Sequence, residues 1–335
     1  MYTKTIAALG AAGLSMSIAT AAQAECGELV VADMNWASAN LMANVDKIIL
    51  EAGYGCEVEL VPGGTETVFA SMNEKGKPDM APELWANAVR TLLDVAAEEG
   101  RLHILNDGPI TGLGEGWWVT KAFREAHPEL DTVEKMLEHP ELVPDIEDPS
   151  KGAFMGCPAG WGCQLINANL FRAFDMEAKG WKLVDPGSAA GLDGAIAKAS
   201  ERGEPWFGYY WAPTSVIGKY DLQMLPFEAE WAGKENWDDC ISLTEEECEN
   251  PQRTSYTKSE AFSVVTDGFM KTGGDAAAYV TARTFPGKVM NGMLVYMTEE
   301  QATGEDAAWY FLENYEDIWT QWVSPEVAAK IKSEL

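Results

Sequence analysis

Strand-like and helix-like segments alternate along most of this chain, and no other feature restricts the fold as strongly. Short apolar runs such as ELVVAD, CEVELVP and LHILND are separated by amphipathic segments such as SANLMANVDKIILEAG and ANAVRTLLDVAAEEG. Strands that alternate with helices of about 10–16 residues favour a mostly parallel sheet covered on both faces. The sequence therefore predicts an α/β fold.

Glycines interrupt this alternation at TGLGEGWWVT, where we expect the chain to pass into a second lobe. The later run AFSVVTDGF is predicted to return to the first lobe as a strand. We therefore expect two α/β lobes, residues 25–111 with 261–335 and residues 112–260. Two lobes joined by two crossover segments form a hinged cleft, the usual architecture for closure around a ligand.

The first 24 residues have the pattern of a cleaved secretory signal. Lys4 precedes an apolar run of small residues that ends at Ala22-Gln23-Ala24, an A-x-A cleavage site. No later stretch is apolar enough to span a bilayer. We therefore expect a mature chain from about residue 25 that is soluble, exported to the periplasm and not inserted in the membrane.

The charge and the cysteines restrict the function. A net charge of −29 makes the chain repel nucleic acid and anionic membranes. The six cysteines suit an oxidising compartment, and proximity in sequence suggests three disulfides: Cys26 with Cys56, Cys157 with Cys163, and Cys240 with Cys248. With three histidines and no CxxC motif, we expect no zinc site, no Cys-His catalytic pair and no cofactor. The acidic segment around Cys240 and Cys248 could still hold calcium.

Three of the 13 tryptophans stand at distinctive positions. Trp85 follows PEL at the end of a predicted strand, Trp161 lies on a glycine-rich turn, and Trp211 ends the strand PWFGYYW. The carboxyl ends of strands are where ligands bind in open α/β sheets. Indole faces that converge there suit a cation without N–H donors, such as a methylated ammonium, through cation–π contacts. The alternative is that these are ordinary core tryptophans.

The turn MGCPAGWGC is predicted to bring a second kind of group to the same place. Gly160 and Gly162 let the backbone pass close to a ligand, and the amides of Gly162 and Cys163 open the helix that follows. A helix N-terminus attracts negative charge. A Cys157–Cys163 disulfide would fix the turn, which would then offer a ring to a cation and amide donors to an attached oxygen.

These elements together resemble the glycine betaine/proline betaine substrate-binding proteins of ABC importers. The resemblance covers essentially the whole mature chain and rests on GCPAGWGC, FGYYWAP, PELW and GEGWWVTKAF, in the expected order. It implies a two-lobed, type II-like periplasmic binding protein that performs no chemistry. It also implies that Trp85, Trp161 and Trp211 form the cage, and that the Gly162 and Cys163 amides receive the ligand's carboxylate. A membrane permease and its ATPase are the implied partners of a monomer.

The first crossover departs from the betaine-binding pattern. It reads Glu115-Gly116-Trp117-Trp118, where such relatives have a neutral residue and a single aromatic. Trp117 or Trp118 is expected to add a fourth ring, and Glu115 to disfavour a ligand with its own carboxylate. The pattern is similar to that of the members that bind trimethylamine N-oxide, with choline, glycine betaine or dimethylsulfoniopropionate as alternatives. Glu115 could instead be a solvent-facing hinge residue. A sensor lobe and a secreted hydrolase are the other functions considered, and the hydrolase lacks a G-x-S-x-G motif.

Overall fold

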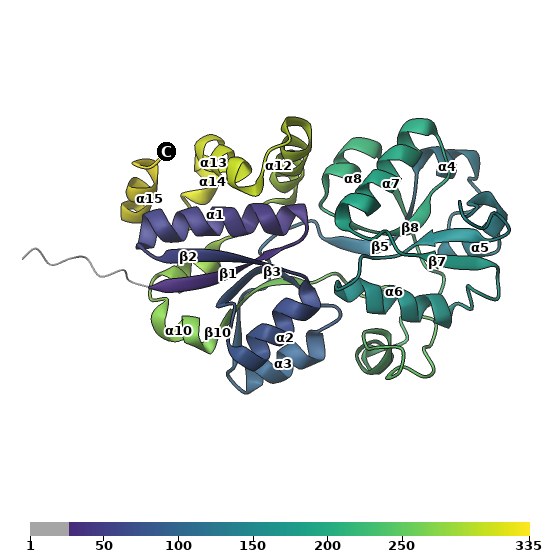
Figure 1. Cartoon of the computed structure of the whole chain (residues 1–335), viewed down its shortest axis with the longest axis horizontal. Coiled ribbons are helices and arrows are strands. Elements are labelled where there is room, and N and C mark those ends of the chain that lie inside the picture. The colour runs from purple at the N-terminus through teal and green to yellow at the C-terminus, as the bar shows by residue number, and fades with distance from the viewer. Residues whose placement is uncertain (1–26) are drawn as a thin grey trace, which may run out of the picture.

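The computed structural model describes residues 27–335. The predicted signal sequence and Cys26 lie outside the described residues. Two lobes lie side by side, each with one five-stranded sheet and helices on both of its faces (Figure 1). Between β4 and β5, and again between β9 and β10, the chain passes from one sheet to the other.

The first sheet has the strand order β2-β1-β3-β10-β4. Its strands are β1 (Glu28–Met34), β2 (Glu57–Gly63), β3 (Met80–Trp85), β4 (Leu102–Asn106) and β10 (Ala261–Thr266). β1 pairs in parallel with β2 and β3, whereas β10 runs antiparallel to both β3 and β4. Every residue of β10 is buried, as expected for an apolar strand between two neighbours in a covered sheet.

The second sheet has the order β7-β6-β8-β5-β9. Its strands are β5 (Gly114–Val119), β6 (Gly152–Met155), β7 (Trp181–Val184), β8 (Phe207–Ala212) and β9 (Gln223–Leu225). β6 is parallel to β7 and β8, and β5 is antiparallel to β8 and β9. Both sheets are therefore mixed, but four of the five strands in each sheet run in the same direction, as expected for mostly parallel sheets. In each sheet the strand that enters from the other lobe, β10 or β5, runs against its neighbours.

Nine helices of the described chain belong to the first lobe, and α1 is the longest of them. Its buried face carries Leu41, Val45, Ile48 and Ile49, the spacing of an amphipathic helix. The helices are α1 (Ala37–Tyr54), α2 (Thr65–Lys75), α3 (Arg90–Glu98), α10 (Asp267–Thr272), α11 (Ala276–Ala282), α12 (Gly287–Glu300), α13 (Gly304–Asn314), α14 (Glu316–Trp319) and α15 (Pro325–Lys332).

The second lobe carries α6 on one face of its sheet and α7 and α8 on the other (Figure 1). Its helices are α4 (Lys121–Ala126), α5 (Val133–Leu137), α6 (Gly162–Ala173), α7 (Ala189–Arg202), α8 (Ser215–Tyr220) and α9 (Lys234–Asn236), with the short turns η1 (Pro140–Leu142) and η2 (Trp237–Ile241). Disulfides join Cys157 to Cys163 and Cys240 to Cys248. The predicted pairing of Cys56 with Cys26 stays a prediction, because Cys26 is not described.

Residues 27–335 contain neither a membrane-spanning helix nor a cluster of metal-binding side chains. No helix in this part of the chain is long and apolar enough to cross a membrane. The same residues contain no group of three or more histidine, cysteine, aspartate or glutamate side chains placed to hold a metal ion. The acidic segment around the Cys240–Cys248 disulfide therefore contains no such group.

Candidate functional site

A pocket between the two lobes brings together residues from both sheets. It is lined by Trp36, Thr65, Trp85, Asn87, Ala88, Glu115, Trp161, Gly162, Cys163, Ile166, Tyr209 and Trp211. The first lobe contributes the ends of β1 and β3, and the second contributes β5, β8 and the start of α6. Residues of both lobes are therefore needed to form this pocket.

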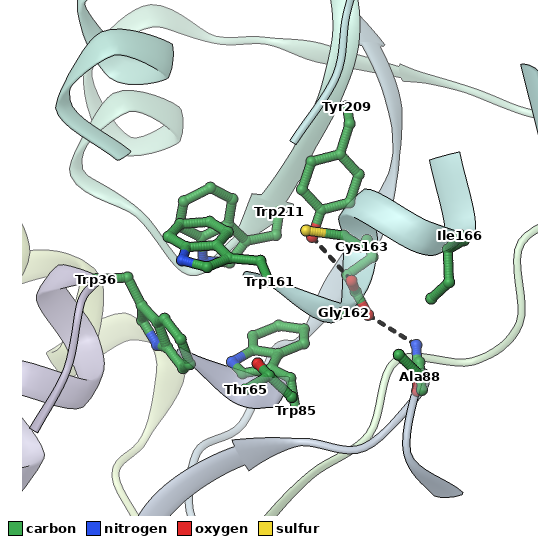
Figure 2. A pocket seen from close by; sticks show the side chains of 12 residues that line it. Trp36, Thr65, Trp85, Ala88, Trp161, Gly162, Cys163, Ile166, Tyr209 and Trp211 are labelled. Atoms are coloured by element: carbon green, nitrogen blue, oxygen red, sulfur yellow. Dashed lines mark hydrogen bonds between the residues drawn. The ribbon is translucent and has the colours of Figure 1, made fainter. Parts of the chain in front are cut away.

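Four indole rings surround the space in this pocket (Figure 2). The Trp36 and Trp161 rings meet edge to face with centroids 5.4 Å apart, and Trp161 meets Trp211 in the same way at 5.1 Å. Trp85 completes the set at the end of β3. Edge-to-face packing keeps neighbouring rings at steep angles, so their faces form separate walls. We call these four residues the tryptophan cage.

Hydrogen bonds fix three of the four indoles from behind. The N–H groups of Trp36 and Trp85 both donate to Oε1 of Glu83, at 2.9 and 2.7 Å. The indole N–H of Trp161 donates to Oδ1 of Asn35, across the cleft, at 2.7 Å. Because these polar edges are paired with protein atoms, the cage offers its π surfaces to whatever occupies it.

Glu115 lies at the start of β5 and faces the same pocket. Its Oε1 accepts from the Tyr209 hydroxyl at 2.8 Å, and its Oε2 accepts from the Asn87 side chain, in the other lobe, at 2.7 Å. The side chain is buried. Burial raises the pKa of the Glu115 carboxyl to about 7, although the hydrogen bond from Tyr209 lowers it. The solvent-facing alternative for Glu115 is therefore wrong.

The glycine-rich turn enters the pocket at the N-terminus of α6. Trp161 is the N-cap residue, and Gly162 and Cys163 are the first two residues of the helix, where amides have no acceptor within the helix. Gly160 has a φ of 83°, a conformation that favours glycine. A Cβ on Gly162 would lie 2.5 Å from the Cβ of Ala88 in the other lobe. Gly162 therefore permits the lobes to close fully.

Trp117 and Trp118 do not line the pocket, and the expectation that one of them adds the fourth ring is wrong. The Trp117 ring is fully buried in the second lobe, 4.5 Å from Phe154 between centroids, and its N–H donates to Asn167. Trp118 donates to the backbone oxygen of Tyr210. Trp117 stands two residues after Glu115 in β5, about 7 Å further along the strand. At this position the Trp117 ring lies in the core of the second lobe.

The fourth ring of the cage comes from Trp36, which the sequence analysis missed. Trp36 follows β1 directly and is the N-cap residue of α1. A position just after a strand is the same signal that identified Trp85 and Trp211. Tyr209, Asn87 and Glu83 were missed as well, and they carry no comparable signal in the sequence.

Comparison with known proteins identifies the family. The model of the OpuAC family, the substrate-binding domain of ABC-type glycine betaine transport systems, matches residues 27–314. The chain belongs to this family. The family is one of substrate-binding proteins of transport systems. A trimethylamine N-oxide-binding protein from Pelagibacter ubique is 24% identical over 303 residues, which are 87% of this chain and 89% of that protein.

Several solved structures of binding proteins resemble the fold of this chain at low sequence identity. The glycine betaine/L-proline-binding protein ProX from Borrelia burgdorferi matches 91% of this chain and 99% of its own, with a TM-score of 0.71 and 15% identity. A choline-binding protein in complex with choline has a TM-score of 0.70 at 16% identity, with 92% and 98% of the two chains covered. Lactococcal OpuAC in its closed form with glycine betaine has a TM-score of 0.65 at 17% identity, and the match covers 89% of this chain and 100% of that chain. These matches confirm the two-lobed binding-protein fold.

Proposed function

We propose that this protein captures trimethylamine N-oxide in the periplasm and delivers it to a membrane permease with its ATPase. The tryptophan cage would hold the trimethylammonium group, and Glu115 would bind the oxygen. Each desolvated cation–π contact contributes about 2 kcal/mol. Four rings therefore suffice for micromolar binding, which needs about 8 kcal/mol.

The buried carboxyl of Glu115 is the observation that carries this proposal. An N-oxide oxygen is a single, strongly negative acceptor, and a protonated carboxyl can donate to it. Burial brings the pKa of Glu115 to about 7, so the protonated form is available near neutral pH. Tyr209 and Asn87 hold the two carboxyl oxygens from either side, which leaves the group oriented before the ligand arrives.

A second carboxylate makes a betaine less favourable at this site. Oε1 of Glu66 is buried without a hydrogen-bond partner, and it lies 3.5 Å from the point that a Cβ on Gly162 would occupy. The N-terminus of α6 therefore already has a carboxylate beside it. A ligand carboxylate placed at the Gly162 and Cys163 amides would meet Glu66 and Glu115 as like charges whenever these two groups are ionised.

A calorimetric titration series tests the proposal with the purified mature chain. Trimethylamine N-oxide should bind most tightly, choline next, and glycine betaine, carnitine and dimethylsulfoniopropionate more weakly. Choline is the second candidate because an ionised Glu115 could accept a hydrogen bond from its hydroxyl group. Tighter binding of glycine betaine than of trimethylamine N-oxide would refute the assignment. Uptake of the ligand by cells that lack this protein would refute its role in delivery.

A further inference from the structure

Glu83 lies behind the tryptophan cage without lining the pocket. It is fully buried and stands two residues before Trp85 in β3, so the two side chains point to the same face of the strand. Its Oε1 accepts three hydrogen bonds, from the Trp36 indole, the Trp85 indole and the Ser38 hydroxyl. One carboxyl oxygen therefore holds two of the four cage rings.

Burial opposes a negative charge on Glu83, whereas the groups around its carboxyl support one. Trp36 and Ser38 stand at the N-terminal end of α1, where the helix dipole favours an anion. Burial is the largest influence and leaves the pKa of Glu83 raised, although the three donors and the charge of Arg283 lower it. Three donors that converge on one oxygen are typical of a carboxylate. Oε2 of Glu83 has no hydrogen-bond partner.

The nearby buried cation is already paired with another acid. Arg283 is fully buried, and its Nε lies 2.8 Å from Oδ1 of Asp46. Its terminal nitrogen donates to Ser263 and to the backbone oxygen of Pro82. With Arg283 paired to Asp46, the charge of Glu83 has no cation of its own among the described residues that contact it. An uncompensated buried charge is costly.

We propose that Glu83 is the buried counter-charge of the cage, a positioning residue that selects ligands with a cationic head group. This inference rests on the proposed function. The carboxylate fixes the Trp36 and Trp85 rings through their N–H groups, and its charge acts through those rings on the methylated ammonium in front of them. The ligand then supplies the positive charge that Glu83 lacks in the empty protein.

The test compares trimethylamine N-oxide with tert-butanol, a neutral molecule of nearly the same shape in which carbon replaces the charged nitrogen. Affinities are measured by calorimetry or by competition, in wild type, Glu83→Gln, Glu83→Asp and Ser38→Ala. Glu83→Gln keeps an oxygen acceptor but removes the charge. It should weaken N-oxide binding at least tenfold and tert-butanol binding less than about threefold.

The other two variants separate the charge from the geometry. Glu83→Asp keeps the charge on a shorter side chain, so both affinities should fall while their ratio stays within about threefold of wild type. Ser38→Ala keeps the carboxyl group and both indole hydrogen bonds but removes one donor to Oε1, so it should change the ratio of the two affinities less than Glu83→Gln does. An equal loss for the two ligands in Glu83→Gln would reduce Glu83 to a structural residue and overturn the proposal.

Failure of the proposed function and failure of the counter-charge role of Glu83 give different results. Wild type that binds no methylated ammonium refutes the proposed function itself. Wild type that binds the N-oxide with the same affinity as Glu83→Gln overturns only the counter-charge. If Glu83→Gln does not fold, NMR of the wild type decides: the Trp36 and Trp85 indole N–H protons should be deshielded and exchange slowly with solvent. Rapid exchange of both would contradict the proposal.

Discussion

The pH dependence of ligand binding is the most discriminating test of Glu115. If the protonated carboxyl donates to the N-oxide oxygen, binding must weaken as Glu115 ionises. Burial sets the pKa of this group at about 7 in the free protein. About half of the molecules carry the proton at pH 7 and about one in a hundred at pH 9. The affinity for trimethylamine N-oxide should therefore fall about 50-fold between these pH values.

Choline should respond in the opposite direction, because its hydroxyl donates to the ionised carboxylate. Its affinity should rise by up to about twofold between pH 7 and 9, as the ionised fraction grows from half to nearly all. Glu115→Gln is the matched control, since an amide donates at every pH and titrates at none. Its N-oxide affinity should be constant over this range. Glu115→Ala should lose most N-oxide binding, about 1.5–3 kcal/mol for a hydrogen bond to a charged group.

The assay is isothermal titration calorimetry at several pH values between 6 and 9, in buffers of different ionisation enthalpy so that proton uptake is measured as well. Tyr209 stays neutral throughout, because burial raises its pKa well above 10. A flat wild-type profile for trimethylamine N-oxide would refute proton donation by Glu115. The same pH slope in Glu115→Gln as in wild type would assign the titration to another group.

The same carboxyl should also make folding stability depend on pH. Its pKa is raised from 4.5 to about 7, so the folded state binds more protons than the unfolded state between these values. Stability is therefore lost as pH rises through this window. At about 1.4 kcal/mol per pH unit, the loss amounts to about 3 kcal/mol at pH 7.5 relative to pH 4.5. Urea unfolding of wild type and Glu115→Gln should show this difference, and parallel pH profiles would contradict it.

Three further predictions concern the cage and the turn. Trp36→Ala should weaken trimethylamine N-oxide binding at least tenfold, from about 1.4 kcal/mol or more of lost cation–π contact, and unchanged calorimetric affinity would exclude Trp36 from the cage. Replacing Cys157 and Cys163 with serine should reduce affinity while lowering the free energy of unfolding by at most about 2 kcal/mol, since the loop is short. A larger decrease in the free energy of unfolding, measured in urea, would contradict this. Gly162→Ala should hinder closure against the first lobe and reduce affinity, whereas Gly194→Ala, in α7 with open space around it, should not. Equal affinities of the two alanine variants would argue against the close contact.

Much of the site could be predicted because it is built from local signals. Trp85, Trp161 and Trp211 each stand at a strand end or a helix start, and both positions point toward the cleft in an α/β lobe. The cysteines that flank the turn are six residues apart, so their pairing followed from proximity. Trp36 gives the same signal after β1, and was available to the same reasoning.

The sequence by itself determined the alternation of strands and helices, the cysteine-flanked turn and the residue types of the cage, because these depend on neighbours along the chain. Only the tertiary structure decided which tryptophans face the ligand space. Trp117 and Trp118 both lie in β5, and their rings pack within the second lobe. How deeply a residue of a strand is buried depends on the elements packed around the sheet. The contacts of Glu83 with Trp36, and of Glu115 with Asn87, join residues 47 and 28 positions apart. Such contacts arise only when sheets and lobes pack together, because no local pattern fixes which distant donor meets a buried carboxylate.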